Sequence, residues 1–353
     1  MNRRRFVVST LSVAALAAIS PQLVRGAPAR VDVSGAASAS GRVPPPLSLS
    51  LAPRGLIVID LMGGNDGLNT VVPIADPLYR KLRPGLALGT AQTVRLDDTR
   101  RLHAALLPLL PLWQSGEFAI IEGVGVQAGP LGHFRAAQVR RSGSRANVHQ
   151  SGDWLERAMA VRTAAGSPVS AGRRFAAARP VAPSAVPSAA PSLPGRFNDA
   201  AQRAADAMIA DEGIGALRLT LAGFDTHCRQ SVRHAAALTE LAGGITILRH
   251  RLQQAGRWND TLIMTTSEFG RATAENGQGG TEHGGAAPQF LLGGRVQGGF
   301  HGIRPRLEAH GGAIAPGIDH RRVLASVLAS WWGIAPSAVL DDAPTALPGL
   351  FRV

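Results

Sequence analysis

The chain of 353 residues contains a single cysteine, a single tyrosine and a single lysine, Lys81. One cysteine, Cys228, excludes an internal disulfide bond, and only its position beside His227 supports a catalytic thiol, so packing is the simpler interpretation. Aromatic residues make up 5% of the chain, and no basic run interleaved with aromatic residues follows the N-terminus. The formal net charge of +13 therefore rests on arginine, which favours anionic small molecules over nucleic acid as partners.

The N-terminus lacks an apolar run long enough for a comfortable membrane span. The motif "RRRF" at residues 3–6 is followed by an apolar stretch at 11–19 and then by small residues. This pattern is typical of a signal peptide, and its paired arginines indicate the twin-arginine route, which exports folded proteins. We expect cleavage near Ala27 or Ala29, a periplasmic or secreted mature protein and no stable membrane span after cleavage. An uncleaved anchor is the alternative.

The rest of the chain divides by composition. Residues 30–53 are rich in Ala, Ser, Pro and Val without a period and predict a linker. Residues 54–353 predict a single domain, within which about 164–197 form a Pro/Ala/Ser-rich segment. Largely apolar runs of strand length recur between longer helical or loop segments, which predicts an α/β three-layer sandwich with a mainly parallel central sheet. These runs are 56–60, 118–121, 217–221, 261–265 and 289–292.

Apolar residues at steps of three and four predict helices over 230–254 and 320–332. Gly243 and Gly244 weaken the middle of the first helix, and Gly256 is a suitable end for it. A third helix is expected over 103–114, although two prolines oppose it.

Four polar loops carry acids and histidines, and three of them follow predicted strands. They contain Asp66, then Asp225 with His227, then Glu268 with Arg271, and finally Glu282 with His283. Because ligands bind at the carboxyl ends of the strands in an open parallel sheet, we expect these loops to gather at one edge, with the acids and His283 within roughly 10 Å of one another.

Carboxylates together with neutral imidazoles suit Zn²⁺ or Mn²⁺, and carboxylate-rich subsets suit Mg²⁺ or Ca²⁺. Glycines beside these residues would let the backbone approach an ion closely. Simpler interpretations stay open for each loop. Asp66 would cap a helix or close a turn, Asp225 and His227 would form a local pair, and Glu268 with Arg271 would form an ordinary salt bridge.

The stretches "GGNDGLNTVVP", "GHFRAAQ", "GFDTH", "TSEFGRATAEN" and "GTEHG", together with the twin-arginine start, resemble the domain-of-unknown-function family 1501. These exported bacterial proteins belong to the alkaline-phosphatase-like and sulfatase-like superfamily. The resemblance implies an α/β sandwich and metal-dependent hydrolysis or transfer of phosphate or sulfate esters. It also implies a set of metal ligands, namely Asp66, Asp225, His227, Glu268 and His283. Arg271 and His133 would then hold the anionic group, and Glu282 would orient its neighbour.

The sequence also departs from the superfamily pattern. Phe269 stands where a metal-binding His is usual, and no Ser, Thr or Cys occupies the usual nucleophile position. His103 lies at the comparable place, where a structural role is the more common one, and Thr70 lies nearer Asp66. Two interpretations follow: an exported metal-dependent hydrolase, or a catalytically silent member of the fold that binds a ligand or another exported protein.

Overall fold

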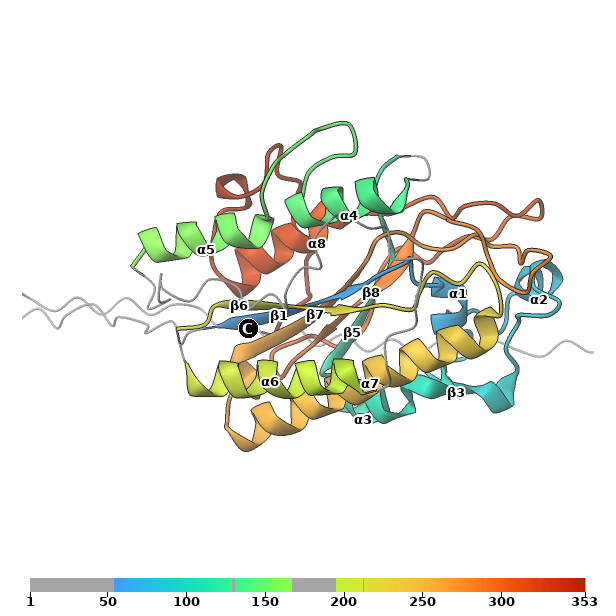
Figure 1. The fold of residues 1–353 in the computed structure, drawn as a ribbon, viewed down its shortest axis with the longest axis horizontal. Helices are drawn as coiled ribbons and strands as arrows, with labels where there is room; N and C mark the ends of the chain where they lie inside the picture. Colours follow the sequence, from blue (N-terminus) through green and yellow to red (C-terminus); the bar gives the residue numbers. More distant parts are fainter. Residues whose placement is uncertain (1–53, 129–130, 167–194, 212, 353) are drawn as a thin grey trace, which may run out of the picture. The chain divides into compact units, whose positions relative to one another are not determined.

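The computed structural model describes residues 54–128, 131–166, 195–211 and 213–352 (Figure 1). The expected signal peptide and linker, and nearly all of the Pro/Ala/Ser-rich segment, lie outside these residues. In the part of the chain that the structure describes, no helix is both long and apolar enough to cross a membrane.

A mixed sheet of seven strands forms the centre, in the order β10-β5-β8-β7-β1-β6, with β9 also paired to β5. Its strands are β1 (Gly55–Leu61), β5 (Phe118–Gly125), β6 (Ala216–Leu221), β7 (Thr261–Ser267), β8 (Ala287–Leu292), β9 (Gly299–Gly302) and β10 (Ile318–Asp319). All five strands expected from the sequence are present. Strand β8 is antiparallel to both of its neighbours, β5 and β7, while every other pairing in this sheet is parallel.

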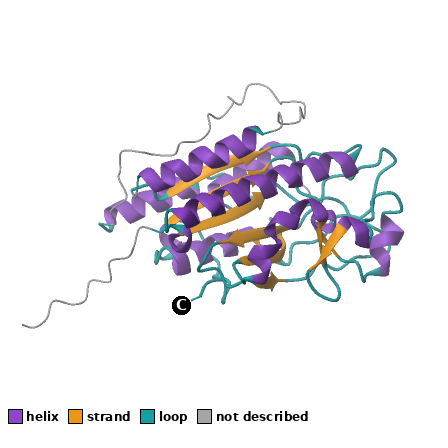
Figure 2. Cartoon of the chain, turned by 90° about the horizontal axis from the view of Figure 1, so that it is seen from below, coloured by secondary structure: helices purple, strands orange, loops and turns teal. Residues whose placement is uncertain are grey.

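Helices cover both faces of the sheet, so the three-layer α/β class is confirmed. In Figure 1, α4 (His133–Ser142), α5 (Trp154–Ala164) and α8 (His320–Ser326) lie above it, and α3 (Leu110–Gln114), α6 (Arg196–Ala210) and α7 (Gln230–Gln254) lie below it. Figure 2 shows the same chain from below, with α6 and α7 running along the sheet.

Strand β1 explains why the apolar runs have no alternating pattern. Ile57, Ile59 and Leu61 pack into one core with α6 and α7, whereas Leu56 and Val58 pack into the other core with α5 and α8. A strand buried on both faces must be apolar at every position. Each residue of β1 from Leu56 to Ile59 is fully buried.

The helix expected over 230–254 has those bounds in the structure, and its two central glycines have a packing role. A Cβ on Gly244 would lie 2.3 Å from the ring of Phe197, so the glycine lets α6 approach α7 closely. Beyond the helix, Gly256 has a φ of 69°, the left-handed conformation that commonly ends helices. The helix expected over 320–332 is α8 followed by a π-helical turn, Val327–Trp331.

The third expected helix is wrong at its start. Residues 101–103 form β4 (Arg101–His103), which pairs with β2 (Val71–Val72) and β3 (Thr93–Arg95) in a small antiparallel sheet. A 3₁₀ segment, Ala104–Leu109, then leads into α3. Pro108 lies in the 3₁₀ segment and Pro111 in the first turn of α3, where a missing N–H is tolerated.

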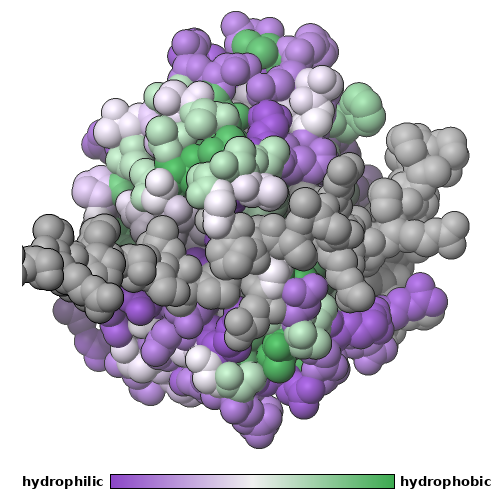
Figure 3. All heavy atoms as spheres, turned by 90° about the vertical axis from the view of Figure 1, so that its left-hand side faces the viewer, coloured by the Kyte–Doolittle hydropathy of each residue, from purple (hydrophilic) through white to green (hydrophobic). Residues whose placement is uncertain are grey.

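The parallel strands all begin at one end of the molecule and finish at the other. The starting end faces the viewer in Figure 3, where the broadest green patch of apolar side chains lies beside hydrophilic residues. The polar loops of the sequence lie at the finishing end, beyond the carboxyl ends of β1, β6 and β7.

Candidate metal centre

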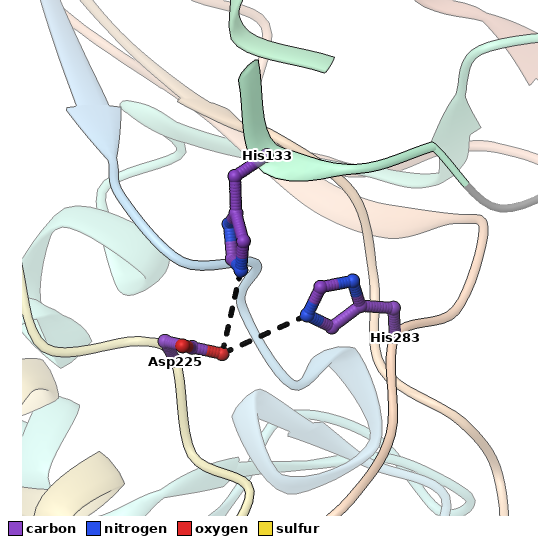
Figure 4. Close-up of side chains that lie close together, drawn as sticks. All are labelled: His133, Asp225 and His283. Atoms are coloured by element: carbon purple, nitrogen blue, oxygen red, sulfur yellow. Dashed lines mark ion pairs between the residues drawn. The ribbon is translucent and has the colours of Figure 1, made fainter. Parts of the chain in front are cut away.

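Three side chains from distant parts of the chain converge at the carboxyl edge of the sheet (Figure 4). His133 is the first residue of α4, Asp225 follows β6, and His283 precedes β8. One ligand atom from each of them lies within 4.8 Å of the other two. His283 reaches this edge because β8 runs antiparallel and therefore starts where β7 ends.

The imidazole Nε2 atoms face one carboxylate oxygen. Asp225 Oδ1 lies 3.7 Å from Nε2 of His133 and 3.8 Å from Nε2 of His283. His227 adds a third ring, with its Nε2 3.2 Å from the same oxygen and 3.1 Å from Nε2 of His283. Histidine, carboxylate and a shared focal point are the components of a metal centre.

Two of the three rings have a carboxylate behind them. Glu268, which is buried, lies 2.6 Å from Nδ1 of His133. The more exposed Glu282 lies 3.1 Å from Nδ1 of His227. A carboxylate on Nδ1 fixes the proton there and turns the Nε2 lone pair toward the centre, as in metal-ligating histidines. Glu282 was expected to orient a neighbour, and the ring that it contacts is that of His227.

The electrostatics favour an ionised acid and a neutral His283. Burial opposes ionisation of Asp225, but the hydrogen bond and charge of Arg271 outweigh it and lower the pKa of Asp225. Burial, with the nearby Arg271 guanidinium, lowers the pKa of His283 to about 4, so its ring is neutral near pH 7. The hydrogen bond that His133 donates to the Glu268 carboxylate raises the pKa of His133.

Phe269 closes one side of the cluster with an apolar ring. Its centroid lies 4.3 Å from that of His283 and 5.1 Å from that of His133. The position that carries a metal-binding His in the superfamily pattern therefore contributes a buried wall in this chain. An apolar wall lowers the local dielectric and strengthens the electrostatic interactions beside it.

Arg271 does not have the free guanidinium that an anion clamp needs. Its side chain is fully buried and donates to the backbone carbonyls of Gly63, Gly64, Phe224 and Thr281 and to the Asp225 carboxylate. These contacts do not support the expected anion-binding role, which stays a prediction, because the donors are already used to tie three loops together. Arg271 and Glu268, which would have formed an ordinary salt bridge, have other partners: Arg271 contacts Asp225, and Glu268 contacts His133.

Asp66 belongs to a separate buried network. Its Oδ1 accepts from the Leu68 amide at 3.2 Å, which caps α1 (Gly67–Thr70), and its Oδ2 lies 2.6 Å from Nη1 of the buried Arg83. Gln230 donates to the same oxygen. Burial opposes ionisation of Asp66, but the Arg83 charge outweighs it and lowers the pKa of Asp66. The capping interpretation is confirmed, and Asp66 is not one of the clustered ligands.

His103 is likewise committed elsewhere. Its Nδ1 accepts from the Ala105 amide at 3.0 Å and caps the 3₁₀ segment, while its ring lies edge-on to His234. Burial lowers the pKa of His103. These contacts give His103 a structural role and do not support it as a nucleophile. Thr70 also bonds away from the cluster, to Asn65 and to the Asp66 carbonyl.

The glycines around the cluster make room for other backbone segments, not for an ion as we had expected. A Cβ on Gly270 would lie 1.8 Å from the carbonyl oxygen of Ala286, and one on Gly284 would lie 2.5 Å from the carbonyl carbon of Arg271. The backbone after β7, around residues 270–271, is therefore in close contact with the backbone before β8, around residues 283–286. A β-bridge between Arg271 and His283 joins the same two segments.

The donor set fits a divalent transition metal. Ligands bound to Zn²⁺ at 2.0–2.1 Å in a tetrahedron lie about 3.3 Å apart. The distances of 3.2 to 3.8 Å from Asp225 Oδ1 to the three Nε2 atoms, and of 3.1 Å between Nε2 of His227 and of His283, are close to that value. With the Nδ1 protons directed at Glu268 and Glu282, the Nε2 lone pairs of His133 and His227 point at the Asp225 carboxylate, an arrangement that a cation between them would stabilise.

A family described as "Protein of unknown function (DUF1501)" matches residues 138–343. The chain belongs to this family. The match confirms the family that the sequence motifs resemble, and it includes Asp225, His227, Glu268 and His283. No curated protein matches the chain.

Solved structures provide more distant similarities. One, Ps i-CgsB in complex with k-i-k-neocarrahexaose, has 10% identity and a TM-score of 0.42 over 83% of this chain and 74% of its own. The C-terminal periplasmic domain of EcEptC from Escherichia coli has 10% identity and a TM-score of 0.40 over 69% and 72%. The lipoteichoic acid synthase LtaP from Listeria monocytogenes has 7% identity and a TM-score of 0.37 over 71% and 66%.

Proposed function

We propose that this protein is an exported hydrolase of phosphate or sulfate esters that works at a single divalent metal ion. The observation that carries the proposal is the convergence of imidazole lone pairs and one ionised carboxylate on a common point. Such a concentration of electron pairs is stable with a cation among them.

His133, Asp225 and His283 would hold the ion, and His227 would flank the remaining position. Two imidazoles and one carboxylate favour Zn²⁺ or Mn²⁺ over Mg²⁺ or Ca²⁺, which prefer oxygen. A bound ion of this kind would polarise an ester oxygen and lower the pKa of a water molecule. Three protein ligands leave a position for substrate or water, as catalytic zinc sites require.

The surrounding residues would prepare this chemistry. Glu268 holds the His133 ring, Arg271 fixes Asp225 and keeps it ionised, and Phe269 limits the access of bulk water to the His283 ring. The Arg83 guanidinium already neutralises Asp66, so the superfamily's first acid would not recruit a second ion. The proposal is therefore a mononuclear centre.

The substrate class and the location rest on the sequence. The superfamily that the motifs resemble acts on phosphate or sulfate esters, and the excess of arginine would attract anionic substrates. The paired arginines at the N-terminus support export by the twin-arginine route.

A catalytically silent binding protein is the second candidate, and one observation favours it. Among the described residues, no hydroxyl or thiol side chain forms a hydrogen bond with any of the clustered side chains. Without such a nucleophile, hydrolysis would need attack by water directly. A silent member would use the same cluster of side chains to bind an anionic ligand or to contact another exported protein.

Untagged mature protein separates these candidates. We expect about one equivalent of zinc or manganese by elemental analysis, and hydrolysis of 4-nitrophenyl phosphate or 4-nitrophenyl sulfate that a chelator abolishes. Asp225→Ala and His283→Ala should lose both metal and activity, whereas His310→Ala, a change at an exposed histidine, should lose neither. Metal without hydrolysis would leave the silent binder, and protein that binds neither Zn²⁺ nor Mn²⁺ on titration would refute the metal centre.

A further inference from the structure

A cleft of about 420 Å³ opens at the same edge of the sheet as the metal centre. It lies between the residues that follow β5 and the start of α8. Because β5 and β10 are parallel, both strands end at this edge. The residues that line it are Val126, Gln127, Ala128, Arg145, Ala146, Asn147, Asp319, His320 and Arg321, none of which belongs to the metal cluster.

The wall of the cleft contains a buried ring with free hydrogen-bonding capacity. His320 is 2% exposed, and its Nε2 has no hydrogen-bond partner among the described residues. Its Nδ1 lies 3.3 Å from the Asp319 carboxylate. A buried polar atom without a partner is costly, so a native structure usually satisfies it with water or a ligand.

A buried arginine stands close to this ring. Arg140 of α4 is 9% exposed, and its Nε and Nη1 have no hydrogen-bond partner among the described residues. It is near enough to Asp319 and His320 for their charges to influence one another. Burial lowers the pKa of Arg140 to about 10, which leaves its guanidinium charged at pH 7.

The other acids within electrostatic reach of Arg140 already have partners. Asp60 accepts from Arg218 at 2.9 Å, and Glu268 is bonded to His133. The Asp60 charge is therefore balanced by Arg218, and the Glu268 carboxylate is held by the His133 ring.

The charge left over around the cleft is positive. Arg321 is neutralised by Asp319 through a contact of 2.6 Å. Arg145 meets only Asp342, at 3.3 Å, in a pair whose side chains are 52% and 70% exposed. Such an exposed pair contributes little and is readily exchanged for another anion. Among the side chains that line the cleft, the two guanidinium groups of Arg145 and Arg321 therefore stand against the single carboxylate of Asp319.

We propose that this cleft binds an oxyanion, a phosphate or sulfate group that is either a free ion or part of a larger ligand. Arg145 would leave Asp342 and contact the anion with its planar fork, which matches such groups well. The anion would lie over His320, against the charge of Arg140. This binding site is independent of the proposed metal chemistry.

Calorimetric titration of the mature protein with sodium phosphate and with sodium sulfate, at fixed ionic strength in NaCl, tests the site. We expect Arg145→Ala to weaken phosphate binding about ten-fold, because one charge-assisted contact is lost. Arg95→Ala is the matched control, since Arg95 also forms an exposed ion pair with an aspartate. Its affinity should stay within about two-fold of the parent. Arg145→Lys should fall between the two, because it keeps the charge without the fork.

His283→Ala, which should empty the metal centre, separates the two sites and should keep the phosphate binding that depends on Arg145. Phenyl phosphate distinguishes the two sources of the anion. Tighter, Arg145-dependent binding of phenyl phosphate would indicate a group on a larger ligand, and weaker binding would indicate a free ion. The proposal is overturned if Arg145→Ala and Arg95→Ala bind alike, if only His283→Ala loses binding, or if the parent binds neither ion at millimolar concentration.

Discussion

Replacing Glu268 with glutamine would test whether the carboxylate behind His133 sets the affinity of the proposed metal centre. The Glu268 side chain is 5% exposed and lies 2.6 Å from the ring nitrogen, so little solvent screens the interaction. Glutamine keeps the size and one acceptor oxygen but removes the charge. Loss of such an outer partner typically costs 10- to 100-fold in metal affinity, or about 1.4 to 2.7 kcal/mol.

Glu282→Gln provides the internal comparison. Glu282 makes the equivalent contact with His227, but its side chain is 64% exposed. Solvent screening should therefore limit the effect of this substitution to about three-fold or less. Zinc affinity can be measured by competition with a coloured chelator, using untagged protein, and the melting temperature of each metal-free variant shows whether folding is intact. Equal effects of the two substitutions, or a larger effect at Glu282, would refute the reasoning.

Three further predictions concern stability and export. Arg83→Met should lower the free energy of unfolding by about 3–5 kcal/mol, because it leaves Asp66 buried without a partner; urea unfolding measures this, and a loss below about 1 kcal/mol would contradict it. Burial lowers the pKa of His234 to about 4, below the unfolded value near 6.5. Between pH 6.5 and pH 4 the unfolded chain takes up a proton at His234 that the folded protein does not. The free energy of unfolding is therefore unaffected by this group above pH 6.5 and falls by up to about 3 kcal/mol as the pH falls toward 4. Urea unfolding at pH 7 and pH 4.5 should show this decrease, and equal stability at the two values would count against it. Replacing Arg3 and Arg4 with Lys should keep the protein in the cytoplasm; cell fractionation would reveal normal export if the twin-arginine assignment is wrong.

The sequence was sufficient for the sheet core and for the clearest helix. A strand buried on both faces is recognisable because polar residues are missing at consecutive positions, as in β1 and β7. It was not sufficient for the direction of β8, since an apolar run has the same composition in a parallel and an antiparallel pairing. The two glycines in the middle of α7 suggest a weak helix in the sequence. Their packing role is visible only in the folded structure, where Phe197 lies against Gly244.

The sequence predicts which residues gather in the candidate site, but it does not distinguish the residues that could bind a metal from those that orient them. Asp225, His227 and His283 lie together in the structure, but in the proposed centre His133 would be a ligand and Glu268 would lie behind it. A carboxylate that binds an ion and one that orients a histidine look alike in a sequence. The ion pair between Asp66 and Arg83 could not be predicted either, because Arg83 is not part of a recognisable motif and only folding brings it to Asp66.

The antiparallel direction of β8 has a consequence for how this family can vary. The connection from β7 to β8 leaves and re-enters the sheet at the same edge, so it needs no crossover helix. Its length and composition can change while the order of the strands stays the same. Glu268, Phe269, Arg271 and His283 all lie on this one connection. Insertions there would reshape the walls of the cluster without disturbing the hydrophobic layers, which lets chemistry diversify on a constant scaffold.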